Sequence, residues 1–238
     1  MKSKFLLLIS LLTLLTSSCV PYINPIETNP LGKTYQGSVN FRNMVLPLPE
    51  GEWKVVGRGY SNDDNYVELC LWKAIGNKPH SVIFIKRDSL SNSFSGYVSS
   101  NDLKRENIHH VVSNSNQRGE AQDGWLINHI RISFNKKSTQ ANKESYQYII
   151  DNKLVMPGNF IQTYHHFTGA NIKKKFLTYS IHVNPEVEGF APPIDSEWAS
   201  SDWNPLKINS DPKKVAYIEK LKEEGAVFHQ KLKEAFGK

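Results

Sequence analysis

The sequence predicts an α+β fold, in which an antiparallel sheet of hairpins packs against two or three helices, including a C-terminal helix. Two pairs of β-rich segments are each joined by a turn-forming stretch. Near the C-terminus, apolar residues recur at the three- and four-residue spacing of a helix that covers a core. The chain contains no internal repeat and no low-complexity domain, so a single globular domain is expected over residues 35–238.

The first β elements are predicted from residue 53 onward. Residues 53–60 have a strand pattern after a turn at Glu50-Gly51-Glu52. The clearest hairpin joins residues 66–75 to residues 80–88 through Gly76-Asn77-Lys78-Pro79. Pairing Ile75 with His80 gives an apolar row that ends in a charge pair, which cross-strand packing favours. The pairs in this row are Trp72–Ile83, Cys70–Ile85 and Glu68–Arg87.

The middle of the chain mixes helical and strand signals. Asn101-Asp102 is predicted to cap a short helix through Val112, and residues 114–124 are expected to form a polar loop. Residues 125–134 alternate like a strand. One predicted face carries Leu126, Ile130, Ile132 and Phe134, and the other carries Ile127, His129 and Arg131.

A helix and a second hairpin follow. Ser138 or Thr139 caps a helix that runs to about Lys153. Residues 160–167 and 172–183 form the hairpin, with a turn at Gly169-Ala170-Asn171. Pairing Thr168 with Ile172 sets His166 opposite Lys174 and His182 opposite Gly158.

The C-terminal helix has a clear start. Asp211 supplies a capping oxygen and Pro212 occupies the first helical position. A single apolar stripe then follows among many lysines and glutamates, and we expect it to pack on the sheet. Its members are Ile218, Leu221, Gly225, Phe228 and Leu232.

The N-terminus has the three parts of a secretory signal peptide over residues 1–18. A short basic start precedes an apolar run from Phe5 to Leu15, and small side chains precede Cys19. The alternative, a transmembrane anchor, needs about 20 apolar residues, and this run is too short. The sequence therefore predicts an exported protein.

The stretch Leu15-Thr16-Ser17-Ser18-Cys19 resembles the lipobox of bacterial lipoproteins. The resemblance implies that the chain is cut before Cys19, which then carries fatty acyl chains such as palmitate and anchors the protein to a membrane. Because Val20 is not aspartate, the expected location in a Gram-negative cell envelope is the periplasmic face of the outer membrane. Thr16 stands where an aliphatic residue is commoner, so cleavage by an ordinary signal peptidase stays open. In that case Cys19 is free to form a disulfide with Cys70.

Residues 19–34 are predicted to be the lipidated cysteine and a tether. Pro21, Pro25 and Pro30 favour an extended spacer that rises about 3.1 Å per residue. Further on, residues 46–53, Leu-Pro-Leu-Pro-Glu-Gly-Glu-Trp, resemble a segment of uncharacterised exported proteobacterial proteins. That resemblance implies no activity.

The charge is mildly basic. The formal net charge of the 238 residues is +6, and loss of Lys2 and Lys4 with the leader lowers it to +4, from 27 basic and 23 acidic residues. This is far below the concentrated positive surface of a nucleic-acid-binding protein, so nucleic acid is not expected as a partner. Anionic lipid, a wall polymer or an envelope protein suits the charge and the location better.

Two groups of residues are candidates for ligand binding. Trp198 and Trp203 lie in a loop rich in aromatic, proline and acidic residues and are able to stack on sugars or peptides. The favoured alternative is that they fill the gap between the sheet and the C-terminal helix. Lys173, Lys174 and Lys175 form the densest positive run, although lysines also protect exposed sheet edges from aggregation.

No cofactor or metal site is predicted. The eight histidines make no known ligand spacing, and His165 and His166 point to opposite faces of a strand.

The sequence therefore predicts a membrane-anchored envelope lipoprotein with a non-enzymatic binding or structural role. It contains no glycine-flanked serine elbow, phosphate-binding glycine loop or zinc-protease motif. The alternative is a cell-envelope hydrolase with a dispersed active site. Its first candidate residues are His129, Arg131, Asp195 and Glu197.

Overall fold

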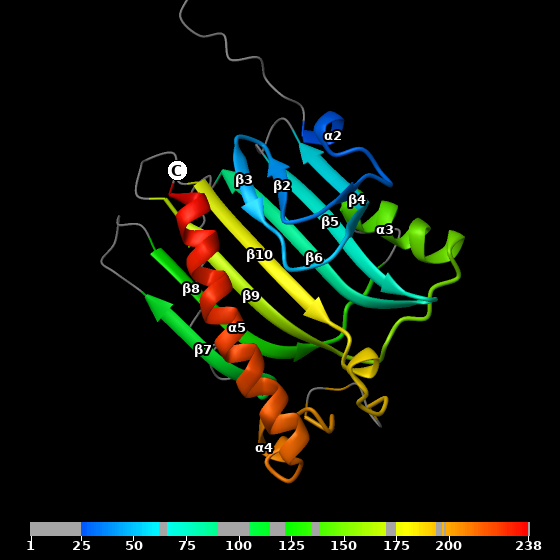
Figure 1. The fold of residues 1–238 in the computed structure, drawn as a ribbon, viewed down its shortest axis with the longest axis vertical. Helices are drawn as coiled ribbons and strands as arrows, with labels where there is room; N and C mark the ends of the chain where they lie inside the picture. Colours follow the sequence, from blue (N-terminus) through cyan, green and yellow to red (C-terminus); the bar gives the residue numbers. More distant parts are fainter. Residues whose placement is uncertain are drawn as a thin grey trace, which may run out of the picture.

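A computed structural model of the chain describes residues 25–61, 66–89, 105–114, 122–134, 139–169, 175–193, 197 and 199–237. Its centre is an eight-stranded sheet in which every pair of neighbouring strands is antiparallel (Figure 1). The strands are β1 (Thr34–Tyr35), β4 (Trp53–Ser61), β5 (Tyr66–Ile75), β6 (Lys78–Ser89), β7 (Ile108–Asn114), β8 (Gln122–Ile130), β9 (Phe160–Thr168) and β10 (Lys175–Val183). Their order across the sheet is β1-β4-β5-β6-β10-β9-β8-β7. The predicted class, an antiparallel sheet with helices that include one at the C-terminus, is confirmed.

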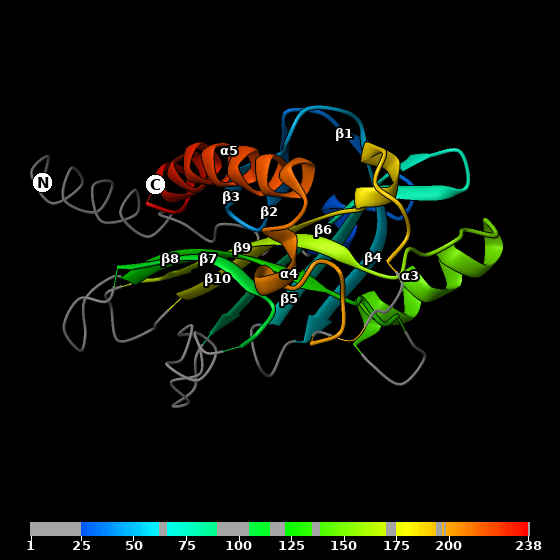
Figure 2. The same cartoon turned by 90° about the horizontal axis from the view of Figure 1, so that it is seen from below.

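Helices cover the two faces of the sheet. The long helix α5 (Pro212–Phe236) crosses one face together with the small hairpin of β2 (Ser38–Phe41) and β3 (Met44–Pro47), as Figures 1 and 2 show. We call this the α5 face. Helix α3 (Gln140–Asp151) packs against β4 and β5 on the other side, the α3 face. Three short helices complete the described elements: α2 (Pro25–Thr28), η2 (Pro185–Glu188) and α4 (Pro205–Ile208).

The central strands are buried on both faces. In β5, Leu69 and Leu71 belong to the core under α5, whereas Cys70 and Trp72 belong to the core under α3. Side chains alternate along a strand, so two buried faces require a continuous apolar run. The run Leu69-Cys70-Leu71-Trp72 meets that requirement.

Both long helices begin where the sequence predicts. The Asp211 side chain accepts hydrogen bonds from the backbone N–H groups of Lys213 and Lys214, at 3.0 and 3.3 Å. Thr139 caps α3 by accepting from the backbone N–H of Asn142. The predicted caps of both helices are confirmed.

The predicted register of the first hairpin is wrong by one residue. Trp72 lies opposite Val82, not Ile83, and Glu68 lies opposite Lys86. Gly76 adopts a left-handed φ of 60°, and a two-residue turn closes between Ile75 and Lys78. Lys78 and Pro79 therefore belong to β6, and an irregularity after Lys73 then shifts the pairing.

The second hairpin is also paired differently from the prediction. Thr168 lies opposite Phe176, so His166 faces Thr178 and His182 faces Gln162. The connection between the strands is longer than the predicted three-residue turn. This register places Leu177 beside Phe167 in the core of the α5 face, which the predicted register did not do.

Residues 108–112 are not helical. They belong to β7, in which Val112 lies opposite Trp125 of β8. Pairing with a neighbouring strand outweighs the local helix-capping signal, whose own residues, 101 and 102, lie outside the described part of the chain.

The domain begins earlier than predicted. Residues 25–34 were expected to be spacer, yet Asn29 is 1% exposed and its side chain donates to the Asn40 carbonyl. Gly32 and Lys33 exchange backbone hydrogen bonds with Val55. The part of the predicted tether from residue 25 onward is therefore attached to the folded domain.

No helix among the described residues is long and apolar enough to cross a membrane.

Candidate functional site: a cavity beneath the C-terminal helix

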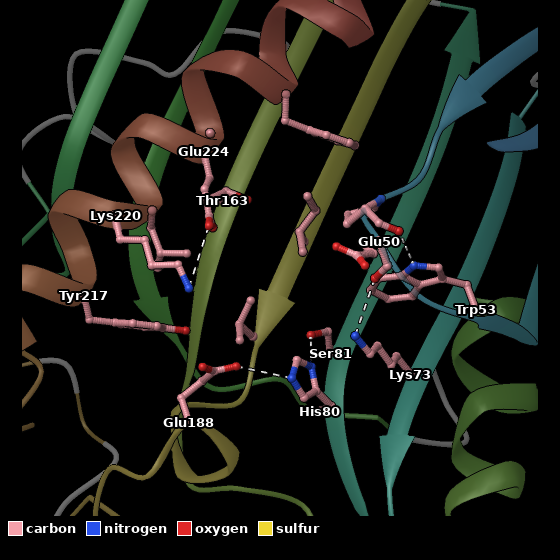
Figure 3. Close-up of a pocket in the computed structure, with 16 residues that line it drawn as sticks. Glu50, Trp53, Lys73, His80, Ser81, Thr163, Glu188, Tyr217, Lys220 and Glu224 are labelled. Atoms are coloured by element: carbon pink, nitrogen blue, oxygen red, sulfur yellow. Dashed lines mark hydrogen bonds and ion pairs between the residues drawn. The ribbon is translucent and has the colours of Figure 1, made fainter. Parts of the chain in front are cut away.

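A cavity of about 410 Å³ lies between α5 and the sheet (Figure 3). Helix α5 contacts β8 and β9 on one side and β3 on the other, and the cavity occupies the space between these contacts. At Gly225 the helix comes so close to Trp125 of β8 that a Cβ atom would lie 2.7 Å from the indole ring. The glycine thus lets α5 lean toward β8.

The cavity wall combines apolar and polar side chains from distant parts of the chain. Helix α5 contributes Tyr217, Lys220, Leu221, Glu224, Gly225 and Phe228. The strands contribute Trp53, Lys73, His80, Ser81, Thr163, Ile181 and Val183, and Pro49, Glu50 and Glu188 come from the adjoining segments. A volume of this size and a mixed lining are typical of small-molecule sites.

His80 connects two polar groups of the cavity. Its Nδ1 lies 2.7 Å from the Ser81 hydroxyl and its Nε2 lies 3.2 Å from a carboxylate oxygen of Glu188. Burial lowers the pKa of His80, and Lys73 lowers it further, against the opposing effect of Glu188. Since a carboxylate only accepts, the neutral ring donates from Nε2 to Glu188 and accepts at Nδ1 from Ser81.

Tyr217 places a buried hydroxyl group in the cavity wall. The residue is 8% exposed, and its hydroxyl is buried without a hydrogen-bond partner among the described residues. Burial raises the pKa of Tyr217, and the carboxylates of Glu188 and Glu224 raise it further. An unpaired buried hydroxyl costs about 1–3 kcal/mol, so a molecule in the cavity that bonds to it would be stabilising.

The remaining charged groups lie at the rim. The Lys73 ammonium donates to the Glu50 carbonyl at 3.4 Å, and Lys220 lies 3.7 Å from Glu224. The Lys220–Glu224 pair is more than half exposed and contributes little to stability.

Trp203, one of the predicted ligand-binding residues, is completely buried. Its ring packs against Phe190 and Tyr217, with centroids 5.0 and 6.1 Å apart, and the Lys214 ammonium lies 5.0 Å from its centroid. No indole surface is left for a ligand to stack on. Trp203 fills the gap beside α5, as the alternative interpretation holds.

Of the other predicted binding residues, one belongs to a described strand. Lys175 begins β10. Cys19, Lys173, Lys174 and Trp198 lie outside the described residues.

The residues predicted for a hydrolase do not meet at the cavity. His129 is fully buried near β7, Arg131 and Glu197 are exposed, and none of the three lines the cavity. Asp195 lies outside the described residues.

Several histidines do gather in space, away from the cavity. His165 and His229 lie 3.2 Å apart between their Nδ1 atoms, and His109 and His129 approach to 3.4 Å. Within the described ranges, no group of three or more His, Cys, Asp or Glu residues is arranged to hold a metal ion.

Comparison with known proteins gives no relative: no family model, no curated protein and no solved structure matches this sequence. The site must therefore be interpreted from its own residues. Sequence reasoning missed most of them because they come from many separate segments and form no motif. The apolar stripe of the C-terminal helix was the only signal, since Leu221, Gly225 and Phe228 belong to it.

Proposed function

We propose that this chain is an envelope lipoprotein, anchored to a membrane through Cys19, whose domain binds a small molecule in the cavity beneath α5. The observation that carries the proposal is the cavity of about 410 Å³ with the buried hydroxyl of Tyr217 in its wall, which has no hydrogen-bond partner in the described ranges. A buried polar group without a partner calls for an explanation, and a ligand bound in the cavity would supply one for Tyr217.

The proposed role is non-enzymatic. The signal peptide and lipobox resemblance at Cys19 support attachment to the cell envelope, and the net charge of +4 after removal of the leader suits a surface with anionic lipid or wall polymer. Expression of the full precursor and mass spectrometry of the mature N-terminus test the anchor. We expect a fatty-acylated Cys19, and a mature chain without acyl groups would contradict this part of the proposal.

Blocking the cavity tests the binding site. Thr163 is 6% exposed and points into the cavity from β9, so Thr163→Phe should fill it. We expect small-molecule fragments to shift NMR signals of the native protein and not of this variant. Thr34→Phe, on the exposed part of β1, is the control and should bind as the native protein does. Equal fragment binding by all three proteins would place the site elsewhere.

One observation favours a second candidate, an acyl hydrolase. Ser81, His80 and Glu188 form a hydrogen-bonded chain in the cavity wall, an arrangement that activates a serine hydroxyl in other enzymes. In the reaction, Ser81 Oγ would bond to the acyl carbon, His80 Nδ1 would take its proton and pass it to the leaving group, and water would then release the acyl group. Ser81 is only 4% exposed, which favours binding over catalysis. Covalent labelling of Ser81 by a fluorophosphonate, lost in Ser81→Ala, is the result that would support the hydrolase.

A further inference from the structure

We propose that the cavity beneath α5 takes a ligand with a primary amine head group and an apolar body. The ammonium group would lie between the Tyr217 hydroxyl and the carboxylate of Glu188. This inference rests on the proposed function, because it assigns a chemical class to the ligand of the same cavity.

The Tyr217 hydroxyl identifies where the polar end of the ligand binds. The side chain extends from α5 toward the cavity, as Figure 3 shows, and it is more than nine-tenths buried. Its oxygen has no partner among the described residues, so both its donor and its acceptor capacity are unused. An ammonium group donates three hydrogen bonds, and the phenol oxygen is a suitable acceptor for one of them.

The carboxylate of Glu188 determines the sign of the charge that this position favours. Figure 3 shows Glu188, the last residue of η2, on the same side of the cavity as the Tyr217 hydroxyl, whereas Glu224 of α5 is paired with Lys220 at 3.7 Å. His80 engages only the Oε1 atom of Glu188. In the described part of the chain, Oε2 of Glu188 makes no hydrogen bond and is available to a ligand that donates.

The charge of the whole wall agrees with a cation. It has three carboxylates, Glu50, Glu188 and Glu224, and two ammonium groups, Lys73 and Lys220. With His80 neutral, the lining carries a formal charge of −1. A ligand with one positive charge brings the site to neutrality, whereas a carboxylate ligand would raise the imbalance.

The rest of the wall suits an apolar body. Ile181 and Val183 of β10 line the cavity together with Leu221 and Phe228 of α5. These four side chains provide aliphatic and aromatic surface beside the polar end. A hydrocarbon chain of a few carbons gains hydrophobic stabilisation there.

A matched series of ligands tests the inference. Hexylamine, hexan-1-ol and hexanoate share one carbon chain and differ only in the head group. Each is titrated by NMR into the lipidated mature protein in nanodiscs, with empty nanodiscs as the blank. We expect hexylamine to bind about tenfold or more tighter than hexan-1-ol, the effect of hydrogen bonds to a charged group.

Three variants locate the head group. Glu188→Gln and Tyr217→Phe should each weaken hexylamine about tenfold and weaken hexan-1-ol clearly less, because its hydrogen bonds involve no charge on the ligand. Glu223→Gln, an exposed substitution on α5 outside the cavity, should change neither. Tyr217→Phe should not lower the melting temperature, because the hydroxyl that it removes has no partner in the part of the chain that the structure describes; a purely structural role would predict a loss.

The outcomes separate the inference from the proposed function. Equal binding of the three ligands, or tightest binding of hexanoate, would overturn the amine assignment and leave a ligand cavity in place. Preferential binding of hexylamine that survives both cavity variants would also overturn the assignment. If none of the three ligands binds and the fragment test with Thr163→Phe is negative as well, the cavity is not a ligand site and the proposed function fails.

Discussion

The two faces of the sheet are covered in different ways. On the α3 face, helix and strand are in close contact, because a Cβ atom on Gly57 of β4 would overlap the Ala141 carbonyl and the Ser145 hydroxyl of α3. Apolar side chains such as Trp72 and Phe160 fill the rest of that core. On the α5 face, the helix leaves a cavity, and the Tyr217 hydroxyl in its wall has no hydrogen-bond partner among the residues that the structure describes.

This difference suggests a division of roles. A close-packed face contributes stability but offers no room for a ligand, whereas a site for a polar ligand needs space and unpaired polar groups. In this protein, the same central strands support both faces. We therefore expect substitutions at the α3 contact to affect stability alone, and substitutions in the cavity wall to affect ligand binding.

Lowering the pH should have the largest effect on the free energy of unfolding, because both faces contain buried neutral histidines. Burial lowers the pKa of His182 on the α3 face to about 3 and that of His165 on the α5 face well below 6.5. The unfolded chain takes up protons below pH 6.5 while the folded protein does not, so stability falls as the pH decreases from 6.5. Each histidine that stays neutral should cost about 2 kcal/mol at pH 5.

Urea unfolding at pH 7.5 and pH 5 measures this loss. His182→Gln should remove about 2 kcal/mol of the difference between the two pH values. His110→Gln, at a less buried position on β7, is the control and should remove less. A free energy of unfolding that does not change between the two pH values would show that the buried histidines are charged in the folded protein.

Trp203→Ala should be the most damaging single substitution on the α5 face. Trp203 is fully buried beside Tyr217, and removal of a buried tryptophan costs about 3–5 kcal/mol. Chemical denaturation measures the loss. Trp203→Phe keeps most of the packing and should cost clearly less. Unchanged stability of Trp203→Ala would mean that the residue does not fill the gap beside α5, and its role as a ligand contact would be open again.

Gly57→Ala tests the close contact on the α3 face. The added methyl group has no space against the backbone of α3, and we expect a loss of about 2 kcal/mol or more. Gly59→Ala is a matched control on the same strand, because its Cβ would lie no closer than 3.4 Å to the nearest atoms. Similar unfolding free energies for the two variants would show that α3 shifts without cost and that the face is not close-packed.

The sequence predicted features that depend on neighbouring residues and missed those that depend on distant ones. The caps at Asp211 and Thr139 involve backbone groups two or three residues away, and both are confirmed. The hairpin registers depend on the φ of Gly76 and on a connection longer than a tight turn, which composition does not reveal.

The cavity also depends on contacts between distant residues, which the sequence does not reveal. The apolar stripe of the C-terminal helix predicts that Leu221 and Phe228 face the sheet, and they do. The space between them and β10 arises because α5 approaches β8 at Gly225 and is held by β3 on its other side. Tyr217 lies beside the stripe in the sequence, and only the tertiary structure shows that its hydroxyl is buried without a partner in the described segments.

The smallest expected effects on stability come from substitutions at the helix caps, and these substitutions distinguish the roles of the two faces most directly. Asp211→Ala removes hydrogen bonds to two backbone N–H groups of α5, and Thr139→Ala removes one in α3. Each change should cost about 1 kcal/mol. Hydrogen exchange of each folded variant should then be faster than in the native protein, locally in the first turn of the affected helix.

Because the cavity wall begins at Tyr217, within the second turn of α5, fraying after Asp211→Ala should also weaken ligand binding, whereas Thr139→Ala should leave it unchanged. If Thr139→Ala weakens binding as much as Asp211→Ala does, the two faces are coupled through the sheet and the division of roles between them is wrong.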